Sequence, residues 1–237
     1  GRSVTRHGGG IDSILTMDVY LDHNATTPVL PEVVGAMSVA LSQPGNASSV
    51  HRYGRLVRRT IDDAREAVAR LVGTCAGNVV FTSGGTEANN LALRGLGART
   101  MVSAVEHESV LSAREDASLI PVDRNGRVDL DQLKILLTDS EPQTLVSVMF
   151  ANNETGVIQP VSEVAALAHE YGALVHCDAI QAAGKLPVDM DALGVDMLTL
   201  SAHKLGGPQG VGALILRAGL DPEPLLRGGG QERRRRA

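Results

Sequence analysis

Residues 174–204 read LVHCDAIQAAGKLPVDMDALGVDMLTLSAHK, and this stretch decides the fold class. It contains two short apolar runs, 174–177 and 197–200, and polar residues follow each run directly. Runs of this length and composition are typical of buried strands. Because helical patterns separate such runs along the chain, we expect βα units and a mainly parallel sheet.

Five more apolar runs extend this pattern along the chain. They are residues 79–82, 100–104, 119–122, 145–150 and 213–216. Together the seven runs predict one α/β sheet of seven strands flanked by helices. The last run differs, because only a glycine-rich turn (205–212) separates it from the run before it. That turn is short for a crossover connection, so we expect the last strand to run antiparallel.

The spacing of apolar residues indicates two helices clearly. In the first helix these residues recur at steps of four and three, and Gly73 follows as a stop signal. Its apolar positions are Val57, Ile61, Ala64, Val68 and Leu71. The second helix is expected to begin with Ser162 as its N-cap and to end at Gly172.

Composition excludes several classes of protein. Of the 237 residues, 43% are hydrophobic and 21% charged, which argues against disorder, collagen and coiled coil. No apolar run approaches the roughly 20 residues of a membrane helix. Residues 1–10 lack the apolar stretch of a secretory signal, and two cysteines cannot form a disulfide framework. We therefore expect a soluble, cytoplasmic protein with no membrane partner.

The formal net charge of -5 gives no electrostatic case for nucleic-acid binding. The basic run at residues 233–236 is interpreted as a solvated segment, so we expect no direct nucleic-acid partner. Residues 1–16 are unpatterned, and we interpret them as an N-terminal extension before a start at Met17. Residues 17–237 are expected to form one large domain.

Polar residues follow five of the seven predicted strands. Ligands of open α/β sheets bind beyond the carboxyl ends of the strands, so these residues are expected to meet at one edge. The segments are SGGTEANN (83–90), VEHES (105–109), ANNETG (151–156), DAIQ (178–181) and SAHK (201–204).

Three of these segments indicate particular chemistry. Residues 83–86 lie between a strand and a helix, where free N–H groups and a hydroxyl could bind an anion or form a simple N-cap. Asp178 ends an apolar strand, so its carboxylate needs a partner, either a protonated heterocycle or the next helix. Lys204 is one of three lysines against nineteen arginines. It is a candidate for chemistry that needs a neutral amine, with an ordinary surface lysine as the alternative.

The histidines allow two further interpretations. His107 could stack on a planar ring or move protons, or it could be a hydrogen-bonded structural residue. His176, Asp178 and His203 can be imagined as metal ligands. The chain has neither an HExxH pair nor a cysteine-pair spacing, however, so we expect no metal.

In their order along the chain, these segments resemble the cysteine desulfurases of the NifS and IscS type. Those proteins are pyridoxal-phosphate (PLP) enzymes of the class V aminotransferase group. The similarity runs from residue 17 to residue 237 and corresponds to the N-terminal part of the family. It also includes YLDHNATTP (20–28), GNASSVH (45–51) and GGGQERRRR (228–236). The resemblance implies a PLP-dependent transferase of fold type I, represented here by its large domain.

The resemblance also implies roles for nine residues. Lys204 would bind the cofactor covalently and move protons on the substrate, and His107 would stack on the ring and assist proton transfer. Asp178 would pair with the pyridinium nitrogen. The other implied cofactor contacts are Asn153 and Gln181 at the phenolic oxygen, and Gly85, Thr86, Ser201 and His203 at the phosphate.

The implied reaction converts L-cysteine to L-alanine and passes the sulfur to an enzyme cysteine as a persulfide. The persulfide would serve iron–sulfur cluster assembly or tRNA thiolation, and the implied partners are a sulfur-acceptor protein and a second copy of the chain in a homodimer. Alternatives are selenocysteine lyase, another class V enzyme, and a catalytically silent PLP-binding fragment.

The family's nucleophilic cysteine, its carboxylate-binding arginine and its C-terminal small domain lie downstream of the matched region. Cys75 falls in a turn and Cys177 in an apolar strand, so neither takes the role of nucleophile. We therefore expect this chain alone to be inactive.

Overall fold

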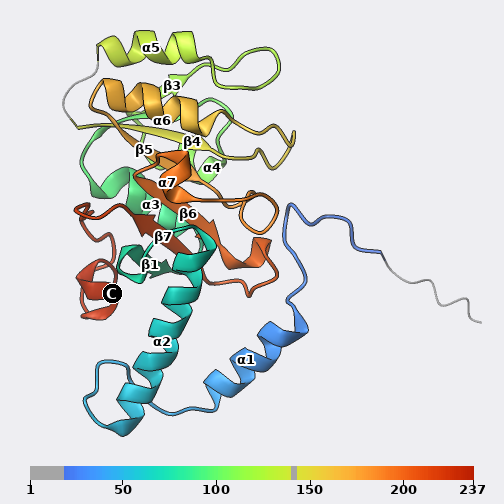
Figure 1. Cartoon of the computed structure of the whole chain (residues 1–237), viewed down its shortest axis with the longest axis vertical. Helices are drawn as coiled ribbons and strands as arrows, with labels where there is room; N and C mark the ends of the chain where they lie inside the picture. The colour runs from blue at the N-terminus through green and yellow to red at the C-terminus, as the bar shows by residue number, and fades with distance from the viewer. Residues whose placement is uncertain (1–18, 140–142) are drawn as a thin grey trace, which may run out of the picture.

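A computed structural model describes residues 19–139 and 143–237 (Figure 1). Its centre is one seven-stranded sheet with the strand order β1-β7-β6-β5-β4-β2-β3. The strands are β1 (Val79–Thr82), β2 (Arg99–Ser103), β3 (Ser118–Ile120), β4 (Thr144–Met149), β5 (Leu174–Asp178), β6 (Met197–Ser201) and β7 (Gly212–Leu216). All seven predicted strands are present, and the α/β class is confirmed.

Strand β7 is the one strand of this described sheet that runs against the others. It pairs antiparallel with both β1 and β6, whereas the remaining neighbours pair in parallel. The predicted reversal of the last strand is therefore confirmed. Every residue of β4, β6 and β7 is buried, which explains why these strands have no alternation of polar and apolar residues.

Helices cover both faces of the sheet and form two separate cores (Figure 1). On one face, α3 (Gly85–Gly95) packs Ala88 and Leu91 into the core that contains Leu214. On the other face, α6 (Val161–Glu170) packs Val164 and Ala168 into the second core. Burial of a leucine such as Leu91 contributes about 1.5–3 kcal/mol to stability. Because both faces are covered, the carboxyl-end edge of the sheet is left for the site.

Both predicted helices are present, with one error in a boundary. Helix α2 (Arg52–Leu71) ends before Gly73, which has a positive φ of 66° and so favours glycine. Helix α6 begins two residues earlier than predicted, so Ser162 lies inside its first turn and Pro160 is the N-cap. The prediction of Ser162 as the N-cap was therefore wrong. Proline suits the start of a helix because its ring restricts φ and the missing N–H is not needed there.

The remaining helices are short or peripheral. Helix α1 has no buried residue and lies away from the sheet (Figure 1). The bounds are α1 (Pro31–Leu41), α4 (Glu108–Leu111), α5 (Leu130–Thr138), α7 (Met190–Leu193), η1 (Ala76–Asn78), η2 (Ala202–Lys204) and η3 (Gln231–Arg234). Within residues 19–139 and 143–237, none of these helices combines the length and apolarity that crossing a membrane requires.

The arginine run near the C-terminus is solvated only in part: Arg233 and Arg234 are exposed, but three of the four arginines contact other parts of the protein. Arg233 donates to the Gly77 carbonyl at 2.7 Å, and Arg235 pairs with Asp221 at 2.8 Å. Arg236 pairs with Glu87 of α3 at 2.7 Å. The planar guanidinium group of arginine has several N–H donors in fixed directions, which suits it to such directed hydrogen bonds and ion pairs.

Candidate active site

A pocket of about 590 Å³ lies beyond the carboxyl ends of the parallel strands. Its lining includes all nine residues to which the resemblance assigns a role, contributed by five separate segments. These residues are Gly85, Thr86, His107, Asn153, Asp178, Gln181, Ser201, His203 and Lys204. The expectation that these strand ends meet at one edge is therefore confirmed, while the roles of the residues stay predictions.

Asp178, the last residue of β5, is only 4% exposed. Its Oδ2 accepts a hydrogen bond from Asn89 Nδ2 at 2.8 Å, and its Oδ1 accepts one from the Ile180 backbone N–H at 2.9 Å. Burial raises the pKa of Asp178, and these bonds together with the charges of His107 and Lys204 oppose the rise. Among the described residues Asp178 forms no ion pair, so a cationic group on a ligand would stabilise its charged form.

Glu106 is a second buried carboxyl group close to Asp178. Its Oε1 accepts a hydrogen bond from the Met149 backbone N–H. Its Oε2 and the Asn89 Oδ1 are buried acceptors for which the described residues supply no donor. Burial and the charge of Asp178 both raise the pKa of Glu106 well above its usual value. Burial thus favours the protonated form of Glu106 more strongly than that of Asp178.

Lys204 lies at the end of η2, directly after β6, and is partly buried. Its Nζ donates to the backbone carbonyls of Asn24 and Ala25, the latter at 2.7 Å. Burial and the charge of Lys185 lower the pKa of Lys204, while Asp22 and Asp178 act in the opposite direction. A lowered pKa increases the fraction of neutral amine, which is the form that attacks a carbonyl carbon.

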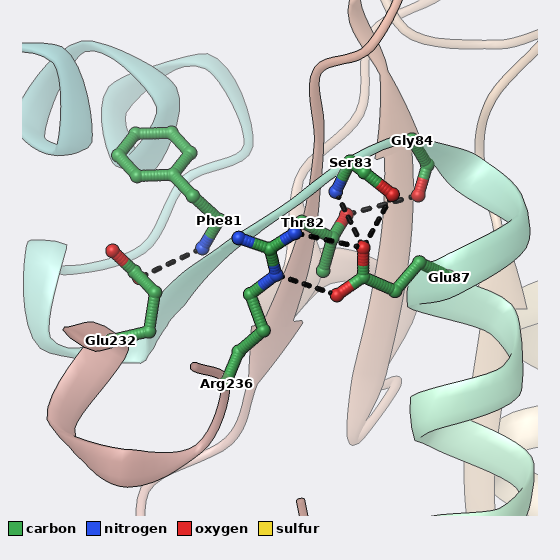
Figure 2. Close-up of polar contacts among 7 residues, drawn as sticks. All are labelled: Phe81, Thr82, Ser83, Gly84, Glu87, Glu232 and Arg236. Carbon is green, nitrogen blue, oxygen red and sulfur yellow. Dashed lines mark hydrogen bonds and ion pairs between the residues drawn. The ribbon is translucent and has the colours of Figure 1, made fainter. Parts of the chain in front are cut away.

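The start of helix α3 forms another side of the pocket, with Gly84 as its N-cap. The first N–H groups of a helix have no acceptor within it, and its dipole favours an anion there. A Cβ at Gly85 would lie 2.2 Å from the Ile180 Cδ1, so a larger residue there would require the Ile180 side chain to move. Within the segment 83–86, the N–H and the hydroxyl of Ser83 are not free to bind an anion, because both donate to Glu87 (Figure 2).

Two further residues line the pocket near Lys204. Ser201 ends β6 and is 3% exposed. His203 contacts Thr26 through its Nδ1, at 3.0 Å from the Thr26 Oγ1. Burial, together with the charge of Lys204, lowers the pKa of His203. A neutral imidazole can donate one hydrogen bond and accept another.

The other predicted contacts are already engaged with protein groups. His107 is the N-cap of α4, and its Nδ1 accepts from the Ser109 N–H at 3.1 Å. Asn153 donates to the neighbouring carboxylate of Glu154 at 2.7 Å. Gln181 donates to the Asn24 carbonyl at 2.8 Å and accepts from Lys185. A ligand would have to compete with these bonds for the two amides.

His176 lies outside the pocket and has a structural role. Its ring nitrogens contact the hydroxyls of Ser147 and Thr199, each at 2.9 Å. Complete burial lowers the pKa of His176 to about 3, so its ring is neutral. In the part of the chain that the structure describes, no group of three or more His, Cys, Asp and Glu side chains is arranged to hold a metal ion.

The two cysteines differ in their surroundings. Cys177 is fully buried, and burial, with Asp178 and Glu106 nearby, raises the pKa of its thiol well above the usual value. Cys75 is exposed and begins η1 at the far end of β1 from the pocket. Burial of Cys177 agrees with its interpretation as an inert thiol.

Sequence reasoning gave no role to Asn89, Glu106 or Asn24. The sequence could have indicated a role for Asn89, because a polar residue on an apolar helix face is buried there and needs a polar partner. Glu106 stands next to His107 in the segment 105–109, but no local sequence pattern indicates that its side chain is buried. Asn24 contacts Lys204 from 180 residues away, and no local pattern indicates such a contact.

The class V aminotransferase family matches residues 19–235, so the chain belongs to that family. Among curated relatives, it is 44% identical to cysteine desulfurase IscS of Dictyoglomus turgidum, over 93% of this chain and 59% of that protein. It is 43% identical to the IscS-like cysteine desulfurase of Mycobacterium tuberculosis, over 90% and 59% of the two chains. The chain thus spans about three-fifths of the length of these relatives.

Solved structures agree with the fold. A NifS-like protein from Rickettsia africae superposes with a TM-score of 0.88 at 37% identity, covering 92% of this chain and 63% of that one. SspA in complex with cysteine superposes with a TM-score of 0.84 at 33% identity, covering 92% and 67%. The seven-stranded architecture is therefore that of NifS-like PLP enzymes.

Proposed function

We propose that this chain is the cofactor-binding part of a PLP-dependent cysteine desulfurase. One observation carries the proposal: an amine with a lowered pKa, Lys204, and a buried carboxylate, Asp178, line the same pocket as the start of α3. These groups complement an aldehyde, a heterocycle nitrogen and a phosphate, which PLP combines in one molecule. When bound, PLP would supply an electron sink for the substrate's Cα.

The protein's own residues would then hold and move protons. Asp178 would keep the heterocycle nitrogen protonated, and His107 would lie against the ring. Lys204, once its amine is free, would take and return the proton at the substrate Cα. The remaining groups would bind the cofactor: Asn153 and Gln181 at the phenolic oxygen, and Gly85, Thr86, Ser201 and His203 at the phosphate.

The overall reaction would transfer sulfur from L-cysteine to an enzyme thiol. The Cβ–S bond of cysteine breaks, a sulfur–sulfur bond forms on the enzyme cysteine, and protons complete the alanine product. Cys177 is buried and Cys75 lies away from the pocket, so we propose that the accepting cysteine belongs to a longer polypeptide. Sulfur would pass from there to an acceptor protein for iron–sulfur cluster assembly or tRNA thiolation.

The complete enzyme is proposed to be a homodimer in which residues 228–231 approach the partner's site. Gly228 has a φ of 147°, a conformation that favours glycine. A glycine-rich turn allows close approach of backbone to a phosphate.

The test of the function is cysteine-dependent alanine formation with PLP in excess. For the present chain we expect weak PLP binding and no turnover, because the sulfur has no thiol to accept it. A version extended to the full length of the relatives is expected to turn over. Sustained turnover by the present chain that is lost in Cys75→Ser would show that Cys75 is the nucleophile and would overturn this assignment.

A further inference from the structure

The C-terminal segment lies against the turn that leads into helix α3 (Figure 2). Arg236 donates from Nε to the Glu87 Oε1 at 2.7 Å and from Nη2 to the Glu87 Oε2 at 3.3 Å. The two side chains are 31% and 14% exposed. This pair is therefore partly shielded from water, where a charge–charge interaction is stronger than on an open surface.

Glu87 in turn holds the start of the helix. Its Oε2 accepts from the Ser83 backbone N–H at 2.8 Å and also from the Ser83 hydroxyl. A glutamate in the first turn that reaches back to a preceding N–H is a variant of the capping box. Glu87 thus fixes the turn 83–86, two residues of which, Gly85 and Thr86, line the pocket.

The segment is anchored independently at Glu232. Its carboxylate accepts from the Phe81 N–H at 2.9 Å and forms a two-pronged pair with Arg65 at 2.7 and 2.8 Å. The backbone of residues 232–234 is left-handed, with φ values of 43°, 57° and 68°. This conformation is unfavourable for residues other than glycine, and the contacts of Glu232 and Arg236 hold the segment in place.

Glu87 presents an electrostatic problem for the proposed cofactor site. Its carboxylate lies at the same helix N-terminus that would bind the phosphate. Burial alone would raise the pKa of Glu87, but the bonds from Arg236 and Ser83 outweigh it and the pKa is lowered. The group is therefore an anion, and without a paired cation it would repel a phosphate dianion nearby.

We infer that Arg236 is a positioning residue for phosphate binding: it neutralises Glu87, so that Glu87 can hold the Ser83 turn without repelling the phosphate. This inference rests on the proposed function in taking the phosphate to be that of PLP. It extends that function to a residue that does not line the pocket and lies 149 positions from its partner.

The test titrates inorganic phosphate into the ligand-free chain and follows the backbone amide resonances of Gly85 and Thr86. Arg236→Gln is expected to weaken phosphate binding about tenfold, the size expected for one partly shielded charge pair. Arg235→Gln is the matched control, because Arg235 pairs with the 78%-exposed Asp221. The control is expected to bind phosphate like the parent protein.

The double variant Arg236→Gln with Glu87→Gln distinguishes charge from simple structural support. The glutamine side chain that Glu87→Gln introduces can still accept the Ser83 N–H but carries no charge. The double variant is therefore expected to recover most of the lost affinity. Should Arg236→Gln not fold, Arg236→Lys replaces it. That variant keeps the charge, and its affinity is expected to lie within about threefold of the parent.

Three results would overturn the inference. In the first, the Gly85 and Thr86 amides of the parent protein do not respond to phosphate. In the second, the Arg236→Gln variant binds phosphate with the same affinity as the parent. In the third, the double variant binds phosphate no more tightly than Arg236→Gln alone. A tenfold loss in Arg236→Lys would equally contradict it. Labelling of Lys204 by pyridoxal, which lacks the phosphate, tests the proposed function separately. A labelled Lys204 with an unaffected Arg236→Gln variant would retain the function and reject the role of Arg236.

Discussion

Lys204 donates a hydrogen bond from its Nζ to the backbone carbonyl of Ala25 at 2.7 Å, although 179 positions separate the two residues. Asp22, in the same N-terminal segment, acts electrostatically on this amine. The surroundings of the proposed catalytic lysine are therefore built by the sheet and by a segment that lies outside it. Changes in either part should alter the reactivity of Lys204.

The pH dependence of Lys204 should shift in opposite directions when its two charged neighbours are removed. Asp22 raises the pKa of Lys204, so Asp22→Asn should lower it further; Lys185 lowers that pKa, so Lys185→Met should raise it. Because the neutral amine reacts, reactivity falls as pH drops through the pKa. Competitive labelling with acetic anhydride, mapped to Lys204, should show midpoints at lower pH for Asp22→Asn and at higher pH for Lys185→Met.

Asp123→Asn is a suitable control for this experiment, because Asp123 does not line the pocket that contains Lys204. Midpoints that moved together in the Asp22 and Lys185 variants would show that the charges of these residues do not govern Lys204.

Replacement of Asn89 by Ala should destabilise the protein more at neutral than at acidic pH. The change removes a donor from the buried Asp178 carboxylate, a loss of about 1–3 kcal/mol. The pKa of Asp178 is already raised in the fold, so its ionisation costs stability as pH rises through the interval between the unfolded and folded values. Without Asn89 that pKa should rise further and extend the loss to higher pH.

Urea unfolding at pH 5 and pH 7.5 measures this difference. Asn90→Ala is the matched control on the same helix, because Asn90 donates to the Thr86 carbonyl and not to Asp178. Equal losses of unfolding free energy at both pH values in Asn89→Ala would contradict the role given to Asn89.

Replacement of Glu106 by Gln should leave the unfolding free energy within about 1 kcal/mol of the parent near pH 4, where this carboxyl group is still protonated in the unfolded chain. The pKa of Glu106 is raised in the fold, so the parent loses stability as pH rises from the unfolded pKa of this group toward its folded pKa. The amide that replaces this carboxyl group cannot ionise, so Glu106→Gln should be more stable than the parent at pH 9.

Glu108→Gln provides the control for the Glu106 variant, because Glu108 is exposed on α4. Denaturant curves across this pH range would reject a neutral Glu106 if the Glu106→Gln variant were strongly destabilised at pH 4.

The parts of the fold that were predicted correctly have local causes. The run at 174–177 forms a strand that is buried on both faces apart from its first residue, and the residues after it meet the other strand ends because the strands are parallel. The start of α6 was misplaced by two positions because Ser162 and Pro160 both give helix-start signals. Local patterns alone do not distinguish between them.

The contacts that were missed join residues far apart in the chain. The arginine run was interpreted from its charge alone, but Arg236 finds a carboxylate 149 positions away. Residues 83–86 were interpreted as an anion-binding turn or a simple N-cap, and the Glu87 side chain occupies the Ser83 N–H of this turn. Such pairings depend on how the helix and the C-terminal segment pack, and no single stretch of sequence contains both partners.

The central claim, that Lys204 is the residue that binds PLP covalently, has one direct test. The protein is incubated with PLP, reduced with borohydride and digested, and the modified peptide is identified by mass spectrometry. We predict a pyridoxyl group on Lys204, formed faster than on Lys134 or Lys185. Labelling of Lys134 or Lys185 with none on Lys204 would contradict the account.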